Sequence, residues 1–153
     1  MYSESGKTTK APKQILFDTA KRVFENAAYA LLSEEAESVG EVMGVEIEFS
    51  GERYGRMRLL VPYELAITCA ANMLGEEEHS AAAREYCEDA LGELLNMITG
   101  SVLPRIFGSE VDLHIGSPRP TGVRSLPLPS ACIETTLCVE GHKVTLCFEN
   151  TRA

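Results

Sequence analysis

The sequence predicts an α+β fold of two layers, in which long helices pack on one face of a largely antiparallel sheet. Three observations support this prediction: long stretches with apolar residues at helical spacing, two alternating segments near residue 50, and a strand-rich last third. The 153 residues are enough for one domain with a core. We therefore expect a single domain over residues 13–153, preceded by a flexible tail over residues 1–12.

The first predicted helix runs from about residue 13 to residue 37. Its apolar residues recur three and four positions apart, at Ile15, Phe17, Val23, Phe24, Ala27, Ala30 and Leu31. In residues 45–49 valine, isoleucine and phenylalanine alternate with glutamate, which predicts a strand with one solvent-exposed face. Gly51 and Glu52 can turn the chain, so residues 54–61 are expected to form a hairpin with this strand.

Two more helices are predicted in the middle of the chain. Pro62 suits the first turn of a helix, and the small apolar residues that follow predict a helix over residues 63–74. Ser80 is a suitable N-cap for a third helix. We expect that helix to continue to about Leu103, where Pro104 bends or ends it.

The last third predicts strands. Apolar residues alternate over residues 111–115, and a proline-rich segment over residues 117–129 predicts a loop. Two strands are then expected at about residues 133–139 and 144–148, with a turn at residues 140–142 between them.

The charge of the chain argues against two classes of partner. It carries 14 lysines and arginines against 23 acids, a net charge of −9. Nucleic acids and anionic membrane surfaces both attract basic patches, so neither is an expected partner. The first residues hold no apolar core of a signal peptide, and no apolar run approaches the ~20 residues of a membrane span. We expect a cytoplasmic protein.

The cysteines and histidines show no ligand spacing. The five cysteines are an odd number without a C-x-x-C pair (Cys69, Cys87, Cys132, Cys138 and Cys147), so we expect structural thiols and no bound metal. His114 stands between two apolar residues of a predicted strand and is expected to face outward.

The third helix carries the most informative pattern. On a wheel of 100° per residue, Asp89, Glu93, Asn96 and Gly100 share a narrow strip opposite the apolar stripe. Glu93 and Asn96 are one turn apart, so they can address one object together. Glycine in a helix costs about 1 kcal/mol relative to alanine. A glycine at position 100 makes sense if another backbone must come close to the helix there. The alternative is a merely solvated face, since exposed helices are rich in such residues.

The strip also resembles a known signature. The pattern Asp/Ser-x-x-x-Glu-x-x-Asn resembles the active-site motif of the CheC/CheX/FliY chemotaxis phosphatases, and DALGELLNMITG over residues 89–100 resembles the CheX branch. The segment GERYGRMRLLVPYELAITCAANMLGEE is similar to the hairpin and short helix that precede this motif in CheX. Resemblance extends over most of the chain after residue 12.

The resemblance implies a phosphatase that hydrolyses the aspartyl phosphate of a CheY-type response-regulator receiver domain. Glu93 would pair with the receiver's lysine, and Asn96 would orient the attacking water. Asp89 would support the motif, as would Gly92 and Gly100 within the matched stretch. The receiver would supply Mg²⁺, so no cofactor is expected on this chain. Such a division suits phosphoryl transfer, which needs positioning and charge stabilisation more than a strong base.

The chain departs from the family pattern in its prolines and in its first helix. The family expects a proline after a gap of 22 residues beyond the asparagine, but Pro118 and Pro120 stand one residue short and one long. CheC-type members carry two motif helices; in the first helix here, if Asp18 aligns with Asp89, Arg22 and Glu25 replace the glutamate and asparagine, so one active site per chain is expected. The CheX branch also implies a homodimer formed through the sheet.

Two other readings remain open from the sequence. The chain could be a non-catalytic module that binds receivers or flagellar-switch partners, or a structural homodimer with a solvated helix face. The intact Asp89, Glu93 and Asn96 set favours catalysis, because a pure binding module has no need of the amide.

Overall fold

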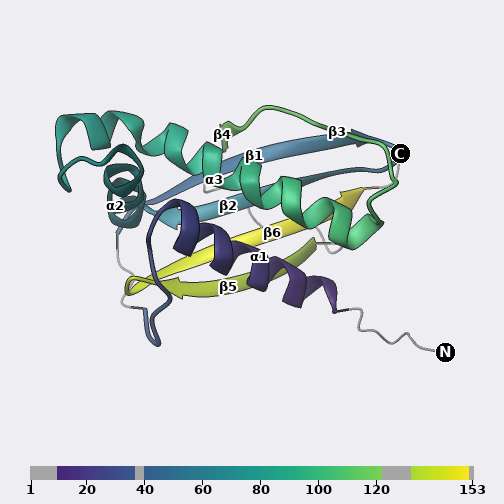
Figure 1. Ribbon diagram of the computed structural model, residues 1–153, viewed down its shortest axis with the longest axis horizontal. Coiled ribbons are helices and arrows are strands. Elements are labelled where there is room, and N and C mark those ends of the chain that lie inside the picture. The colour runs from purple at the N-terminus through teal and green to yellow at the C-terminus, as the bar shows by residue number, and fades with distance from the viewer. Residues whose placement is uncertain (1–9, 37–39, 122–131, 152–153) are drawn as a thin grey trace.

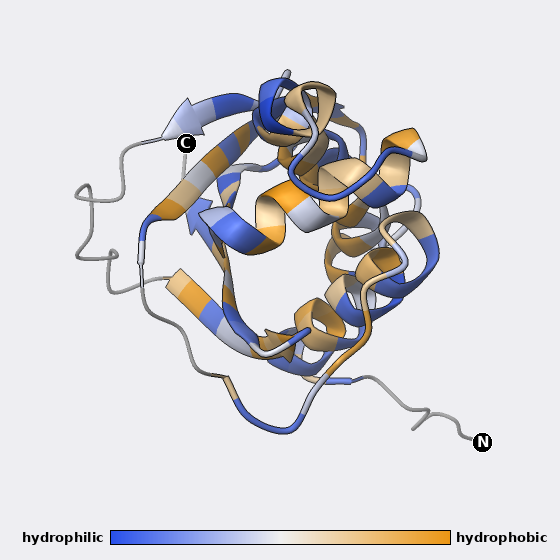
Figure 2. Cartoon of the chain, turned by 90° about the vertical axis from the view of Figure 1, so that its left-hand side faces the viewer, coloured by the Kyte–Doolittle hydropathy of each residue, from blue (hydrophilic) through white to orange (hydrophobic). Residues whose placement is uncertain are grey.

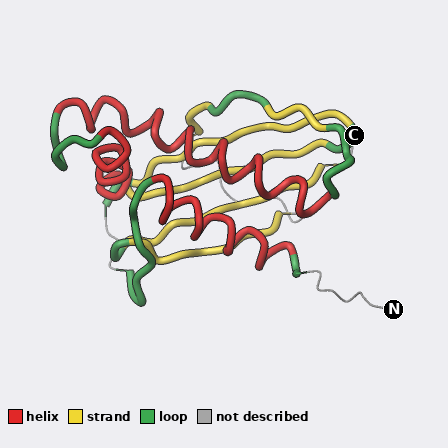
Figure 3. The backbone as a smooth tube through the Cα atoms, in the orientation of Figure 1, coloured by secondary structure: helices red, strands yellow, loops and turns green. Residues whose placement is uncertain are grey.

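The computed structural model describes residues 10–36, 40–121 and 132–151. The elements along the chain are α1 (Pro12–Ala27), β1 (Val42–Gly51), β2 (Tyr54–Pro62), α2 (Tyr63–Leu74), α3 (Ala81–Phe107), β3 (Leu113–Ile115), β4 (Arg119–Thr121), β5 (Cys132–Val139) and β6 (His142–Thr151). All strand pairs are antiparallel, and the helices lie on one side of the sheet (Figures 1 and 3). The predicted α+β architecture is confirmed.

The six-stranded sheet has the order β3-β1-β2-β6-β5, and β4 pairs with β1 beside β3. Apolar and polar residues alternate along the strands (Figure 2). The apolar set faces the helices and is buried, with Val45, Ile47 and Phe49 on β1 and Leu146 and Phe148 on β6. The predicted hairpins form, and Glu140 and Gly141 both have positive φ in the tight turn between β5 and β6.

The predicted first helix was too long at its C-terminal end. α1 ends at Ala27, and the amide of Asn72 on α2 donates a hydrogen bond to the carbonyl of Ala28. Tyr29 then adopts a positive φ, and the chain turns so that Leu32 bridges to Val139 on β5. The segment after residue 27 is apolar but not helical: Ala28 and Ala30 are buried, whereas Tyr29 and Leu31 are exposed.

The N-terminal boundary also shifts. Pro12 is the first residue of α1, one residue before the helix start expected at about residue 13, while residues 1–9 of the expected tail lie outside the described residues. Lys10, just before the helix, pairs with Asp18 at 2.8 Å. A proline in the first helical position loses no helix hydrogen bond.

The third helix extends beyond the expected end near Leu103. α3 passes through Pro104 and ends at Phe107, four residues later. The ring of Phe107 packs against Phe49 and Phe148, with centroids 5.9 and 6.0 Å away. Pro104 has no N–H and so leaves one helix hydrogen bond unmade. The aromatic contacts of Phe107 offset this loss in the last turn.

The predicted loop over residues 117–129 contains a strand that the sequence analysis missed. β4 pairs with β1 across residues 119–121, with Pro120 opposite Val45. Proline is compatible with this position because β4 is short and lies at a sheet edge. The remainder of the predicted loop lies outside the described residues. Among the described helices, none is both long enough and apolar enough to cross a membrane.

Candidate functional site

α3 is a firmly held platform for the motif. Leu91, Leu94, Leu95 and Ile98 are completely buried between the layers. At its start the side chain of Ser80 accepts a hydrogen bond from the backbone of Ala83 at 3.0 Å, which confirms the predicted N-cap. Packing along the inner side of the helix fixes the backbone positions from which its outer side chains project.

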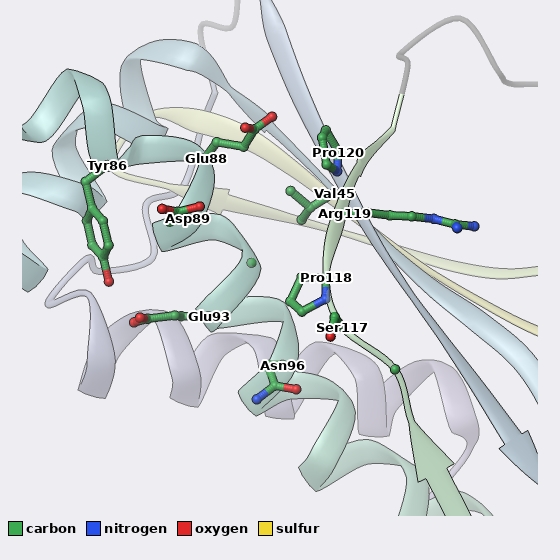
Figure 4. A pocket seen from close by; sticks show the side chains of 12 residues that line it. Val45, Tyr86, Glu88, Asp89, Glu93, Asn96, Ser117, Pro118, Arg119 and Pro120 are labelled. Atoms are coloured by element: carbon green, nitrogen blue, oxygen red, sulfur yellow. The ribbon is translucent and has the colours of Figure 1, made fainter.

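The predicted motif residues lie on the outer side of this platform. Asp89, Glu93, Asn96 and Gly100 are all exposed, as the helical wheel predicts. Figure 4 shows the Glu93 carboxylate extending toward the end of the Tyr86 side chain, while the Asn96 carboxamide projects in a different direction. The two motif groups therefore share one side of the helix without reaching for one another.

A groove of about 520 Å³ runs beside this face. Its second wall is the segment over residues 116–120, which we call the strap because it crosses from β3 to β4 alongside α3 (Figure 4). From the helix the groove is lined by Tyr86, Glu88, Asp89, Gly92, Glu93 and Asn96, and from the strap and sheet by Gly116, Ser117, Pro118, Arg119, Pro120 and Val45.

The two glycines of the motif stretch have different surroundings. Gly92 is buried under the strap, and a Cβ at this position would stand 3.0 Å from the Cβ of Pro118. Gly100 lies outside the groove, and a Cβ there would meet nothing within 4 Å. No backbone of the described chain approaches Gly100, so the expected close approach is not made within this part of the molecule.

Arg119 fastens the strap to the sheet. Its guanidinium donates hydrogen bonds of 2.7 Å to the carboxylates of Glu46 and Glu48 on β1. Glu46 is only 5% exposed and also accepts a bond of 3.1 Å from Arg58. Burial alone would raise the pKa of Glu46, but hydrogen bonds from Arg119 and Arg58 outweigh it and hold the pKa below its ordinary value. The strap is thus held at two adjacent residues, at Arg119 by charge and at Pro118 by packing.

The sequence analysis missed several groove residues. Tyr86 lies seven residues before Glu93, a spacing that places both on one helix face and could have been noticed. The position of Pro118 was ambiguous from its spacing, and the structure brings this proline, rather than Pro120, onto Gly92. Glu88 and Val45 carry no sequence signal for this groove.

Potential metal ligands do not gather in the part of the chain that the structure describes. No group of three or more His, Cys, Asp or Glu side chains there could hold an ion. The five cysteines are free thiols, and Cys69, Cys87 and Cys147 are buried. Burial raises the pKa of Cys69 to about 12, which disfavours its reactive thiolate. His114 is exposed on β3, as predicted.

Comparisons with known proteins place the motif helix in a family. The family model described as "Chemotaxis phosphatase CheX" matches residues 42–121, more than half of the chain. No curated protein matches.

Solved structures share the fold at low sequence identity. Chemotaxis protein CheX from Vibrio vulnificus is 19% identical, with a TM-score of 0.70 over 95% of this chain and 99% of that chain. The CheX–CheY–BeF₃–Mg²⁺ complex from Borrelia burgdorferi gives 16% identity and a TM-score of 0.73, over 93% of this chain and 99% of that one. FliY from Thermotoga maritima gives 15% identity and a TM-score of 0.58, over 95% and 91%.

Proposed function

The chain belongs to the CheX chemotaxis phosphatase family, and we propose that it accelerates hydrolysis of the aspartyl phosphate on a CheY-type receiver domain. The observation that supports this proposal best is the pair of Glu93 and Asn96. They stand one turn apart on a helix whose opposite side is completely buried, and both are exposed. An exposed carboxylate and amide on a firmly packed helix suit docking against another protein's active site.

In this proposal Asn96 is the catalytic residue. An amide can donate to one oxygen and accept from another, so it can hold a water in line with the phosphorus. An acyl phosphate is already reactive, and correct positioning of the nucleophile supplies much of the remaining acceleration. Asn96 is exposed beside the groove, where the receiver's phosphoryl group could reach it.

Glu93 has a binding role in the proposal. Its carboxylate would pair with the lysine ammonium of the receiver's active site and so orient the two proteins. Among the described residues no ion pair neutralises Glu93, so its charge is free to meet an incoming cation. Asp89, one turn earlier, would support this negative face.

The receiver would complete the site with its own metal. The CheX–CheY structure from Borrelia burgdorferi contains Mg²⁺, and we propose that Mg²⁺ is held by the receiver and not by this chain. We further propose a homodimer, as the CheX resemblance implies, and a cytoplasmic location, where receiver domains are phosphorylated. Light scattering of the purified chain tests the dimer directly.

The decisive experiment follows the dephosphorylation of a phosphorylated receiver from the same genome. We expect Asn96→Ala to lose roughly 100-fold in acceleration while still binding the beryllofluoride-activated receiver. Glu93→Ala should lose both binding and turnover. Matched controls are Asn26→Ala, an exposed helical asparagine on α1, and Glu85→Ala, an exposed glutamate on α3 outside the groove.

Each outcome decides between the readings. If the parent does not accelerate hydrolysis but binds the receiver, the chain is a non-catalytic receiver-binding module. If the parent is active and Asn96→Ala equals it, the role assigned to Asn96 is wrong. Controls that fall with the variants would show that these substitutions act through general destabilisation.

A further inference from the structure

The side chain of Tyr86 contacts both the hydrophobic core and the groove. Its ring is partly buried and packs against the hydrophobic cluster, while its side chain also lines the groove. Figure 4 shows its hydroxyl end directed toward the carboxylate of Glu93. The two residues are seven positions apart on α3, a rise of roughly 10.5 Å, which a tyrosine and a glutamate leaning toward each other can span.

The surroundings of the phenol are strongly negative. Burial is the largest influence on Tyr86, followed by the facing Glu93 carboxylate, which as a hydrogen-bond acceptor favours the protonated phenol, and by the negative charges of Glu93 and Asp89; together they raise the pKa of Tyr86 to about 12. The hydroxyl therefore keeps its proton at neutral pH and remains a hydrogen-bond donor. Among the described residues that line the groove, Arg119 is the one cationic side chain; it points away from Glu93 and is bound to Glu46 and Glu48 (Figure 4).

A neutral donor has a particular advantage beside Glu93. An exposed glutamate samples many rotamers, and fixing it on binding costs conformational entropy. A hydrogen bond from a ring that is itself packed restricts the carboxylate before the partner arrives. Because the phenol is uncharged, it leaves the negative charge of Glu93 available to a cation, which an arginine or lysine in its place would neutralise.

We propose that Tyr86 is a positioning residue for Glu93, whose hydroxyl holds the carboxylate at the Tyr86 end of the groove, where it receives the cationic side chain of the partner. This inference rests on the proposed function. It divides the motif into two parts, with Tyr86 and Glu93 recruiting the receiver and Asn96 acting on the water. Tyr86 should therefore affect binding and leave the chemical step unchanged.

The first test is Tyr86→Phe, which keeps the packed ring and removes only the hydroxyl. We expect KM for the phosphorylated receiver to rise roughly fivefold, equivalent to about 1 kcal/mol, with kcat unchanged. The matched control is Tyr63→Phe, which makes the same change in a partly buried tyrosine at the start of α2. In the Glu93→Ala background, Tyr86→Phe should have no further effect, because its partner is gone.

A second test needs no receiver. Tyrosines labelled at the Cζ carbon report their own ionisation by NMR, and the Tyr86 signal is assigned by its loss in Tyr86→Phe. Glu93→Gln should lower the pKa of Tyr86 from about 12 toward its ordinary 10.0, whereas Glu85→Gln should not. An unchanged Tyr86 titration in Glu93→Gln overturns the inference.

The two proposals fail in different ways. An inactive parent overturns the proposed function, and with it the recruiting role of Tyr86. An active parent whose KM is unchanged by Tyr86→Phe, but raised by Glu93→Ala, overturns the positioning role alone. A fall in kcat at constant KM would also contradict it, because it would place Tyr86 in the chemical step.

Discussion

The ring of Pro118 lies directly against the backbone of Gly92, with its Cβ only 3.0 Å from where a Cβ of residue 92 would stand. This contact joins the strap to the motif helix one residue before Glu93. It explains a glycine inside a long helix, where glycine otherwise costs about 1 kcal/mol. The absence of a side chain on Gly92 lets the strap lie this close to the helix.

Alanine at Gly92 and alanine at Gly100 should change the stability of the fold by different amounts. Gly100→Ala adds a methyl group in open space, so the free energy of unfolding should rise by up to about 1 kcal/mol from helix propensity. Gly92→Ala gains the same propensity but must displace Pro118, so it should stabilise less or destabilise. Urea unfolding of the two variants measures this difference. An equal gain in both would show that the strap yields freely.

Receiver binding tests whether Gly100 has a role in docking. If a partner's backbone approaches Gly100 closely, Gly100→Ala should weaken receiver binding although it stabilises the fold. Titration of the beryllofluoride-activated receiver checks this, with Asn26→Ala as the neutral control. Unchanged affinity would mean that Gly100 has no part in docking.

Removing the charge of Arg119 should loosen the strap. Arg119→Met keeps a long side chain but loses the bonds to Glu46 and Glu48. We expect faster hydrogen exchange over residues 116–121, with little change on α3. Arg105→Met, an exposed arginine near the end of α3, is the control. Exchange rates equal to those of the parent would show that the Pro118 contact suffices to hold the strap.

Acid should destabilise the fold partly through Glu46. Its pKa in the folded chain lies below the ordinary value of 4.5, so the folded state binds fewer protons there than the unfolded state. This stabilisation is present above about pH 4.5 and is lost as the pH falls through the lower folded pKa. We expect Glu46→Gln to be less stable at neutral pH and to lose less on acidification, by chemical denaturation at pH 7 and pH 4. The exposed Glu48→Gln should follow the parent's pH dependence more closely.

The N-cap of α3 should contribute measurably to stability. Ser80→Ala removes the bond to the backbone of Ala83 and should cost about 1 kcal/mol, a fall in the thermal midpoint of about 2–4 °C. Ser80→Asp, which can still accept that bond, should restore most of the loss. If aspartate and alanine are equally destabilising, the cap is not the cause.

Local patterns determined the helices, most strands and the exposure of the motif. The 3.6-residue period of α3 places Glu93 and Asn96 opposite its apolar stripe, and this depends only on residues within two turns of each other. The same period misled the prediction for α1, because the segment after Ala27 is also apolar although it runs extended. There Asn72, from a distant helix, bonds to the carbonyl of Ala28.

Only the tertiary structure decided what surrounds the motif. The choice between Pro118 and Pro120 depends on the path by which β3 and β4 return along β1, and the register with Val45 and Glu46 sets that path. The hold of Arg119 on two glutamates likewise joins residues more than 70 positions apart. Periodicity reports which face of an element is buried, because that is a local property. Which distant side chain covers it depends on how all the elements pack together, and no local pattern encodes that.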